Sequence, residues 1–288
     1  MNIFKLLFGI VVLLVPFTAC DPTGDQQVLP DPELAQLNVL FGNPSGATAD
    51  ASVPTNYLIS LPQFSLSYNS TRGIPNWVSW YLSEELIGNS ERQDNFRAYT
   101  ALPSDWYVVK PEDYAFQANG FDRGHNCPSA DRTRSDEDNS ATFYMINMIP
   151  QAPEHNQGIW KDLEEYCRKL VFEGNELYII MGNHGVGGTG LKGYREKLAG
   201  GKITVPRHIW RIIVVLPKGE DDLQRVDEQV RVIAVSIENK DSNGNKDWAD
   251  FRISVNEIEA ATGYDFLSAL PNDVEAILEA QVDEVLIP

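Results

Sequence analysis

Seven short runs of apolar or alternating residues constrain the fold of this chain more than any other feature. Such runs, rich in Val, Ile, Tyr and Trp, are typical of strands, because β-branched and aromatic side chains pack well on a pleated surface. Helical periodicity is found at Asn156–Leu170 and at Val255–Thr262, which Gly263 ends. Strands in series with few helices between them predict an α+β fold, with a central, largely antiparallel sheet flanked by helices. The predicted strands are 57–61, 64–68, 77–82, 176–181, 203–206, 209–216 and 230–237.

The N-terminus has the pattern of an export signal. Lys5 is followed by the apolar run Leu6–Pro16 and by small residues before Cys20, which predicts a lipoprotein signal peptide over 1–19 and lipidation of Cys20. A transmembrane anchor is an alternative, although the run is short for a span, and a soluble secreted form is another. We expect a bacterial lipoprotein anchored to a membrane outside the cytoplasm, in the periplasm or on the cell surface.

Composition divides the rest of the 288 residues. Residues 20–52 are rich in Asp, Pro, Gly and Gln and predict a flexible tether from Cys20. Residues 53–272 are expected to form the folded domain, and residues 273–288 an acidic C-terminal tail that forms a peripheral helix or frays. Besides Cys20, only Cys127 and Cys167 are present. They form a disulfide or stay as two buried thiols, and the sequence does not decide between these.

The net charge of −18 is unusual for a protein that meets nucleic acid, because phosphate contacts come from Lys and Arg. The segment Phe121–Arg211 is neutral, with twelve basic and twelve acidic residues, so the acidic excess lies outside it. We therefore expect weak binding of a polyanion, strongly dependent on salt and Mg²⁺, and no long basic groove.

The segment Asn156–Leu170 has an apolar stripe that predicts a core-facing helix. That stripe consists of Ile159, Leu163, Tyr166 and Leu170. A neighbouring ridge repeats every four residues and consists of Asn156, Trp160, Glu164 and Arg168. Asn156, Glu164 and Arg168 can therefore face one cleft, although Glu164 and Arg168 alone could be an ordinary surface pair.

His125 ends the motif Asp122-Arg123-Gly124-His125. Hydrolysis of a phosphodiester requires a base for water, a cation at phosphorus and stabilisation of the leaving oxygen. His125, Arg123 with Arg168, and a metal at Asn156 meet these needs. The amide oxygen of Asn156 suits Mg²⁺, with Mn²⁺ as a substitute.

Zinc is the alternative metal. It would have to be held by the four histidines, which lack the paired spacing that zinc sites favour. These are His125, His155, His184 and His208.

Together these motifs resemble the DNA/RNA non-specific endonuclease family, whose members are ββα-metal (His-Me finger) nucleases. The resemblance rests on Asp122-Arg123-Gly124-His125, Pro128, Asp131, Asn147-x-x-Pro150-Gln151 and Asn156-Gln157-Gly158-x-Trp160-x-x-x-Glu164. The thirty-one positions from His125 to Asn156 also match the family, and weaker similarity extends from Tyr57 to Pro271. The resemblance implies a nuclease domain over 53–272 whose site is a β-hairpin crossed by a helix.

The resemblance also implies a role for each site residue. His125 is expected to be the general base and Asn156 the direct protein ligand of Mg²⁺. Glu164 is expected to hold water around the metal, and Arg123 and Arg168 to clamp the phosphate. Asn147 is expected to order the site through hydrogen bonds near the base, and Asp122 to fix the turn or pair with an arginine. The products would carry 5′-phosphate and 3′-hydroxyl ends.

Three functions remain open from the sequence. The first is a Mg²⁺-dependent endonuclease that acts on DNA, RNA or both through phosphate contacts. The second is a phosphodiesterase for small nucleotides, and the third is a non-catalytic nucleic-acid-binding lipoprotein. The membrane is an expected partner through Cys20, and no obligate protein partner is evident.

Overall fold

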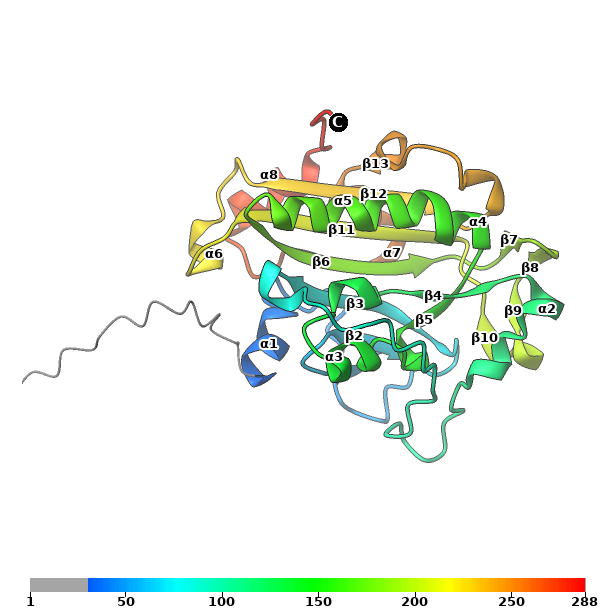
Figure 1. Ribbon diagram of the computed structural model, residues 1–288. Coiled ribbons are helices and arrows are strands. Elements are labelled where there is room, and N and C mark those ends of the chain that lie inside the picture. Colours follow the sequence, from blue (N-terminus) through cyan, green and yellow to red (C-terminus); the bar gives the residue numbers. More distant parts are fainter. Residues whose placement is uncertain (1–30, 288) are drawn as a thin grey trace, which may run out of the picture.

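The computed structural model describes residues 31–287, which form one antiparallel sheet with helices on both faces (Figure 1). The expected signal peptide over 1–19 and the lipidation site Cys20 lie outside the described residues. The sheet has seven strands in the order β1-β2-β3-β6-β11-β12-β13, and each neighbouring pair is antiparallel. The prediction of an α+β fold with a central antiparallel sheet is confirmed.

Most predicted elements are present close to their expected bounds. The sheet strands are β1 Tyr57–Ser60, β2 Ser65–Asn69, β3 Ile74–Leu82, β6 Asn175–His184, β11 His208–Pro217, β12 Arg231–Glu238 and β13 Arg252–Ile253. Separate two-stranded ribbons pair β4 Asp122–His125 with β5 Met148–Gln151, β7 Gly188–Gly190 with β8 Gly193–Arg195, and β9 Lys197–Leu198 with β10 Ile203–Thr204. The helices are α1 Asp31–Leu37, α2 Phe116–Asn119, α3 Asp136–Ala141, α4 Pro153–His155, α5 Lys161–Phe172, α6 Asp222–Arg225, α7 Val255–Thr262 and α8 Asn272–Ala280. The strand predicted at 203–206 is shorter than expected and lies in a ribbon beside the sheet.

Alternation of side chains along the central strands creates a core on each face of the sheet. On β11, Ile209 and Ile213 point into the first core, whereas Trp210 and Ile212 point into the second. Helix α5 lies across the first face, and α7 and α8 lie behind the sheet on the second (Figure 1). The ribbon β4–β5 also packs on the first face, so the elements that carry the candidate residues share one side.

The segment that precedes the sheet is packed, so the prediction of a flexible tether is wrong for residues 31–52. Leu34 on α1 is 3% exposed in the second core. The side-chain amide of Asn38 donates to the carbonyl oxygen of Leu61 at 3.1 Å and accepts the N–H of Tyr81 at 3.0 Å. A few apolar residues in a polar segment are enough to dock it when an apolar sheet face is available. Residues 20–30 lie outside the described part.

The acidic C-terminal segment forms α8, the helix that was one of the two expectations for residues 273–288, but it packs on the domain rather than extending from it as a tail. Helix α8 buries Leu278 in the second core. Beyond it, Asp283 forms ion pairs with Arg231 at 2.8 Å and with Arg252 at 3.1 Å. These contacts anchor the chain end across β12 and β13.

Candidate active site

The candidate site is built from a β-ribbon and the helix that follows it. Strands β4 and β5 are antiparallel, with Asp122 opposite Gln151 and His125 opposite Met148. From β5 the chain passes through α4 and one π-helical turn, Asn156–Trp160, directly into α5. This short path fixes the ribbon against the helix and gives the expected ββα arrangement.

A kink at Gly158 separates Asn156, the predicted metal ligand, from the regular helix. Gly158 has φ −106° and ψ −108°, so the helix predicted from Asn156 becomes a regular α-helix only at Lys161. A Cβ on Gly158 would lie 2.2 Å from the carbonyl oxygen of Gly244, and that oxygen accepts the N–H of Ile159 at 3.1 Å. Glycine is therefore required for the loop at Gly244 to support this turn.

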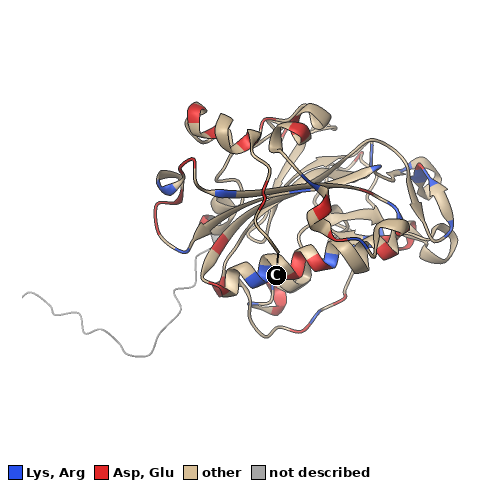
Figure 2. Cartoon of the chain, turned by 90° about the horizontal axis from the view of Figure 1, so that it is seen from above, with Lys and Arg blue, Asp and Glu red and all other residues tan. Residues whose placement is uncertain are grey.

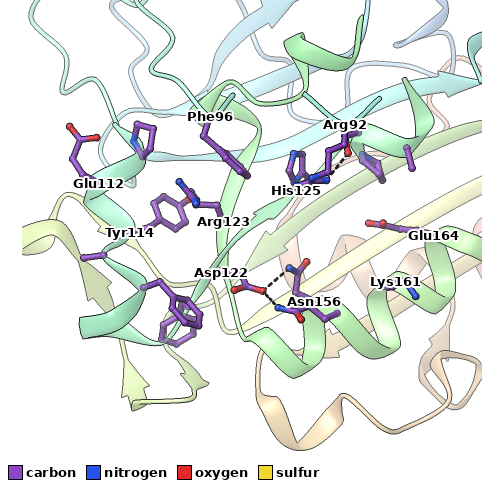
Figure 3. Close-up of a pocket in the computed structure, with 18 of the residues that line it drawn as sticks. Arg92, Phe96, Glu112, Tyr114, Asp122, Arg123, His125, Asn156, Lys161 and Glu164 are labelled. Carbon is purple, nitrogen blue, oxygen red and sulfur yellow. Dashed lines mark hydrogen bonds between the residues drawn. The ribbon is translucent and has the colours of Figure 1, made fainter. Parts of the chain in front are cut away.

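A cleft of about 920 Å³ opens between the β4–β5 ribbon and α5. Five of the six predicted site residues line it, and Figure 3 shows labelled side chains that face it from both elements. These five are Arg123, His125, Asn156, Glu164 and Arg168. The sixth, Asn147, lies outside the cleft.

His125 lines this cleft, and one of its ring nitrogens, Nε2, is buried without a hydrogen-bond partner among the described residues. Its ring packs edge-on against Phe143 at 4.9 Å. Burial lowers the pKa of His125 to about 3, and the charges of Arg92 and Arg123 act in the same direction. The imidazole is therefore neutral at physiological pH and can accept a proton.

Arg92 is a cleft residue that the sequence did not indicate. Its Nη1 donates to the hydroxyl of Ser129 at 2.8 Å, and its guanidinium lies 4.8 Å from the Phe143 ring. It comes from the segment 84–120, which has no motif, so no signal in the sequence identified it. Arg123 stacks on the Phe96 ring at 4.0 Å on the same wall as His125 (Figure 3).

Asp122 orients the proposed metal ligand, rather than pairing with an arginine as one prediction had it. Its Oδ2 accepts the side-chain N–H of Asn156 at 2.9 Å and that of Gln157 at 2.8 Å (Figure 3). A carboxylate accepts only, so Nδ2 of Asn156 must face Asp122. The Oδ1 of Asn156 then remains as an acceptor that receives no hydrogen bond from the described residues.

Two ion pairs connect α5 to its surroundings. Glu164 lies 3.3 Å from Nη2 of the buried Arg211, and Arg168 lies 2.9 Å from Oδ1 of Asp131. Burial raises the pKa of Glu164 to about 7, while Arg211 and Arg168 favour its charged form and Asp131 opposes it. Glu164 and Arg168 therefore interact mainly with other partners, and their i, i+4 spacing is not an isolated surface pair.

Asn147 holds the chain that follows the histidine. Its side chain accepts the N–H of Cys127 at 3.0 Å and donates to the carbonyl oxygens of Cys127 and Thr142, both at 2.9 Å. Its own carbonyl oxygen accepts the side-chain N–H of Asn126 at 2.8 Å. Asn147 is fully buried, so it can position His125 but cannot touch a substrate.

The four histidines do not converge. His184 stacks on His208 at 4.7 Å on the paired strands β6 and β11. His155 is buried, stacked on Trp160 at 5.4 Å, and remote from solvent. Within residues 31–287, no histidine belongs to a group of three potential metal-ligating side chains. The arrangement gives no support to the zinc alternative.

Cys127 and Cys167 are free thiols in the first core, so the disulfide that the sequence left open is not formed. Burial raises the pKa of each thiol to about 12. Both therefore remain neutral and act as small apolar side chains.

The donor set of the cleft fits a hard divalent cation. Asn156 offers an amide oxygen without a partner, and Asp122 and Glu164 add carboxylates nearby in the same cleft. Few protein oxygens and room for water suit an ion that keeps much of its hydration shell. A free imidazole nitrogen, arginines and such an ion site can together support attack of water on a phosphodiester.

Comparisons with known proteins agree with this geometry. Residues 45–273 match the family model described as DNA/RNA non-specific endonuclease. A protein of Nostoc sp. (strain PCC 7120) named Nuclease is 45% identical over 278 residues, covering 96% of this chain and 97% of its own length. The Nuclease of Serratia marcescens is 28% identical over 249 residues, with 85% of each chain covered. One chain in a crystal structure of an EndoG/EndoGI complex has the same fold, with a TM-score of 0.67, 20% identity, and 82% of this chain and 92% of that chain covered.

Proposed function

Because this chain belongs to the DNA/RNA non-specific endonuclease family and is therefore an endonuclease, we propose that it hydrolyses DNA, RNA or both in a Mg²⁺-dependent reaction. Mn²⁺ is proposed as a substitute for Mg²⁺. The observation that carries the proposal is the neutral imidazole of His125, which lines one cleft with Asn156, Glu164 and Arg168.

His125 acts as the general base in the proposed reaction. Its imidazole removes a proton from water as the water oxygen bonds to phosphorus, and the bond from phosphorus to the 3′ oxygen breaks. The departing 3′ oxygen takes up a proton, so the products carry a 5′-phosphate and a 3′-hydroxyl. The depressed pKa of His125 keeps the ring in its neutral form, the form that can accept a proton.

The side chains around His125 can stabilise the negative charge of the reacting phosphate. Arg92 and Arg168 line the cleft and can bind phosphate oxygens, with Arg123 further along the same wall. Asn156 and Glu164 would hold the divalent ion, which when bound supplies positive charge to stabilise the leaving oxygen. Asp122 keeps the oxygen of Asn156 directed away from itself, as required of a ligand.

The test is cleavage of matched DNA and RNA by wild type and by His125→Ala, with and without chelator. Wild type is expected to cleave at least one polymer with Mg²⁺, and His125→Ala to lose at least about 10²-fold in rate. End analysis should find 5′-phosphates. Unchanged cleavage by His125→Ala would refute the role of His125, and cleavage restricted to mononucleotide esters would favour a small-nucleotide phosphodiesterase.

Membrane attachment through lipidated Cys20 in an extracytoplasmic compartment is a separate proposal, supported only by the sequence pattern around Cys20. The helices of residues 31–287 are all too short or too polar to cross a bilayer. Metabolic labelling with a fatty acid, lost in Cys20→Ser, tests the attachment.

A further inference from the structure

Three carboxylates converge on the face of the sheet opposite the cleft. Glu259 belongs to α7, Asp265 to the loop that follows it, and Glu279 to the last turn of α8. One oxygen of each lies within 4.8 Å of the other two. Helices α7 and α8 pack in the second core, whereas the cleft and α5 are on the other face (Figure 1). The cluster is therefore separate from the active site.

Glu279 is the member of this cluster whose surroundings indicate a bound ligand. It is 7% exposed, and its Oε1 has no hydrogen-bond partner. The Oε1 of Glu259, in contrast, accepts the N–H of Phe266 at 2.8 Å. No Lys, Arg or His within residues 31–287 forms a salt bridge with any of the three carboxylates. A buried carboxylate oxygen without a donor is uncommon, because an unpaired charge is costly away from water.

The surroundings increase the negative potential. The last turns of α7 and α8 contain no basic residue, and the C-terminal end of a helix carries partial negative charge. Burial and the carboxylates of Glu259, Glu275 and Asp265 together raise the pKa of Glu279 to about 8. Close carboxylates without a basic partner favour a bound proton or a bound cation.

We propose that Glu259, Asp265 and Glu279 bind a divalent cation of the Ca²⁺ type. Ca²⁺ takes oxygen ligands at about 2.3–2.6 Å, so oxygens on opposite sides of the ion are up to about 5 Å apart. The three oxygens lie within 4.8 Å of one another, which is inside that span. Mg²⁺ demands a nearly ideal octahedron, whereas Ca²⁺ tolerates the irregular geometry of carboxylates from three separate segments.

Such an ion would connect segments far apart in the sequence. It would join α7, α8 and the loop at Asp265 directly. The N–H of Asp265 donates to the carbonyl oxygen of Pro44 at 3.0 Å, which extends the connection to the N-terminal segment. The proposed site is therefore structural, and its loss should loosen both chain ends.

Thermal unfolding of the full chain, stripped of metal and titrated with Ca²⁺, tests the site. We expect the Tm to rise by about 5–10 °C at a Ca²⁺ concentration 100-fold above Kd. The shift should be lost in Glu279→Gln. If that variant does not fold, Asp265→Asn replaces it, because Asp265 is exposed, and it should lose the shift as well. Because Asn156 lies in the cleft, Asn156→Ala should retain the shift.

Tb³⁺ luminescence supplies an independent readout, because Tyr264 is adjacent to Asp265 and can sensitise a bound lanthanide. Sensitised emission is expected from Asn156→Ala. Its disappearance in the double variant Asn156→Ala/Glu279→Gln would support the site. A Tm unaffected by Ca²⁺, as expected if the carboxylates only share a proton, would overturn the proposal. A Ca²⁺ shift that survives Glu279→Gln, or vanishes in Asn156→Ala, would also overturn it.

A second and independent feature is a surface rich in basic residues, the basic end surface. It is formed by residues 190–207, which contain a single acid, Glu196, and none of its basic residues forms a salt bridge with another residue of the described range 31–287. Figure 2 shows Lys and Arg gathered at this end of the molecule. Its basic residues are Lys192, Arg195, Lys197, Lys202 and Arg207.

Most of the described lysines outside the basic end surface, in contrast, form a salt bridge with a neighbouring glutamate. Such pairs are Lys161–Glu165, Lys169–Glu173, Lys218–Glu85 and Lys240–Glu238.

The basic end surface begins at the edge of the cleft. The N–H of Leu191 donates to the carbonyl oxygen of Gly120 at 3.1 Å. Lys192 packs so closely on Gly120 that a Cβ there would lie 2.5 Å from its backbone nitrogen. The next residues, Phe121 to Arg123, line the cleft.

We infer that a nucleic acid held in the cleft continues over the basic end surface, with its phosphates beside these side chains. The inference rests on the proposed function and extends it to long polymers. It explains how a chain of net charge −18 can hold a polyanion, because attraction depends on the local charge near the bound strand.

The test compares Lys192→Gln/Lys197→Gln with the control Lys169→Gln/Lys218→Gln, which changes the net charge equally. On long duplex the first variant should raise KM about tenfold or more and reduce the slope of log K against log salt by about 1.8. Hydrolysis of bis(p-nitrophenyl) phosphate should be unchanged in both. Equal behaviour of the two variants would overturn the inference, whereas a wild type that cleaves no polymer would overturn the proposed function instead.

Discussion

Replacing Arg211 with Met should change the pH dependence of cleavage, although Arg211 does not line the cleft. Arg211 is 1% exposed on β11, its Nη2 lies 3.3 Å from Glu164, and its guanidinium lies 4.7 Å from the Trp160 ring. Met has a similar length and keeps the apolar packing against the rings. The variant therefore removes a positive charge beside Glu164 with little change in volume.

The magnitude follows from the distance between the two charges. A pair 3.3 Å apart interacts by about 5 kcal/mol at an effective dielectric constant of about 20, which sets a ceiling of about 3.7 pKa units. Glu164 is partly exposed and Arg168 also favours its charged form, so we expect the pKa of Glu164 to rise by about 1–2 units. From its value of about 7, Glu164 would then ionise fully only above about pH 9.

The assay is the initial rate of oligonucleotide cleavage at fixed divalent metal, from about pH 5.5 to about pH 9.5. In Arg211→Met the acidic limb of kcat/KM should move up by about 1–2 units, with about a tenfold loss at pH 7 that is recovered near pH 9. Glu164→Gln should show no recovery, and the double variant should behave like Glu164→Gln alone. An acidic limb that does not move in a folded Arg211→Met protein would refute the reasoning.

Three further predictions test other parts of the molecule. Asp122→Ala removes the acceptor that orients Asn156, so divalent-metal affinity should fall about 10–100-fold by calorimetry; unchanged affinity would contradict that role. Leu34→Ala should lower the free energy of unfolding in urea by about 2–4 kcal/mol, whereas a negligible loss would indicate that this segment is not packed. Burial opposes ionisation of Asp283, but Arg231 holds its pKa below 3.8. Asp283→Asn should therefore cost about 3 kcal/mol at pH 7, and this difference from wild type should shrink as the pH falls below about 4.

The fold could be predicted largely because each central strand is buried on both faces and therefore has a strong apolar signal. Val255–Thr262 was also predictable, since its Ser254 capping box and Gly263 cap are local features. The docking of residues 31–52 could not be read from the sequence. That segment is polar on average, and its order depends on a sheet face formed by distant residues such as Trp210.

The site was predictable where its residues share one element or one motif. Asn156, Glu164 and Arg168 of the predicted ridge reach the cleft, even though Gly158 interrupts the helix after Asn156. Trp160, its fourth member, is buried in the core instead. Arg92 could not be found in this way, because it approaches from an irregular segment and is placed by contacts with Ser129 and Phe143. Tertiary contacts of that kind produce no periodic pattern in the sequence.

The order of residues in Asp122–His125 follows from the geometry of a strand. Successive side chains alternate between faces, so Arg123 and His125 share the wall of the cleft that contains Phe96. Asp122 and Gly124 occupy the alternate positions, from which Asp122 reaches Asn156 at the edge of the cleft and Gly124 lies against β5, since a Cβ there would be 2.1 Å from Oε1 of Gln151. The proposed base and phosphate-binding cation on one set of positions, with the acid that contacts Asn156 on the other, require this order. Exchanging Asp122 and Arg123 would therefore place an acid beside the base and a cation beside the metal ligand, and we expect such a chain to fold without cleaving.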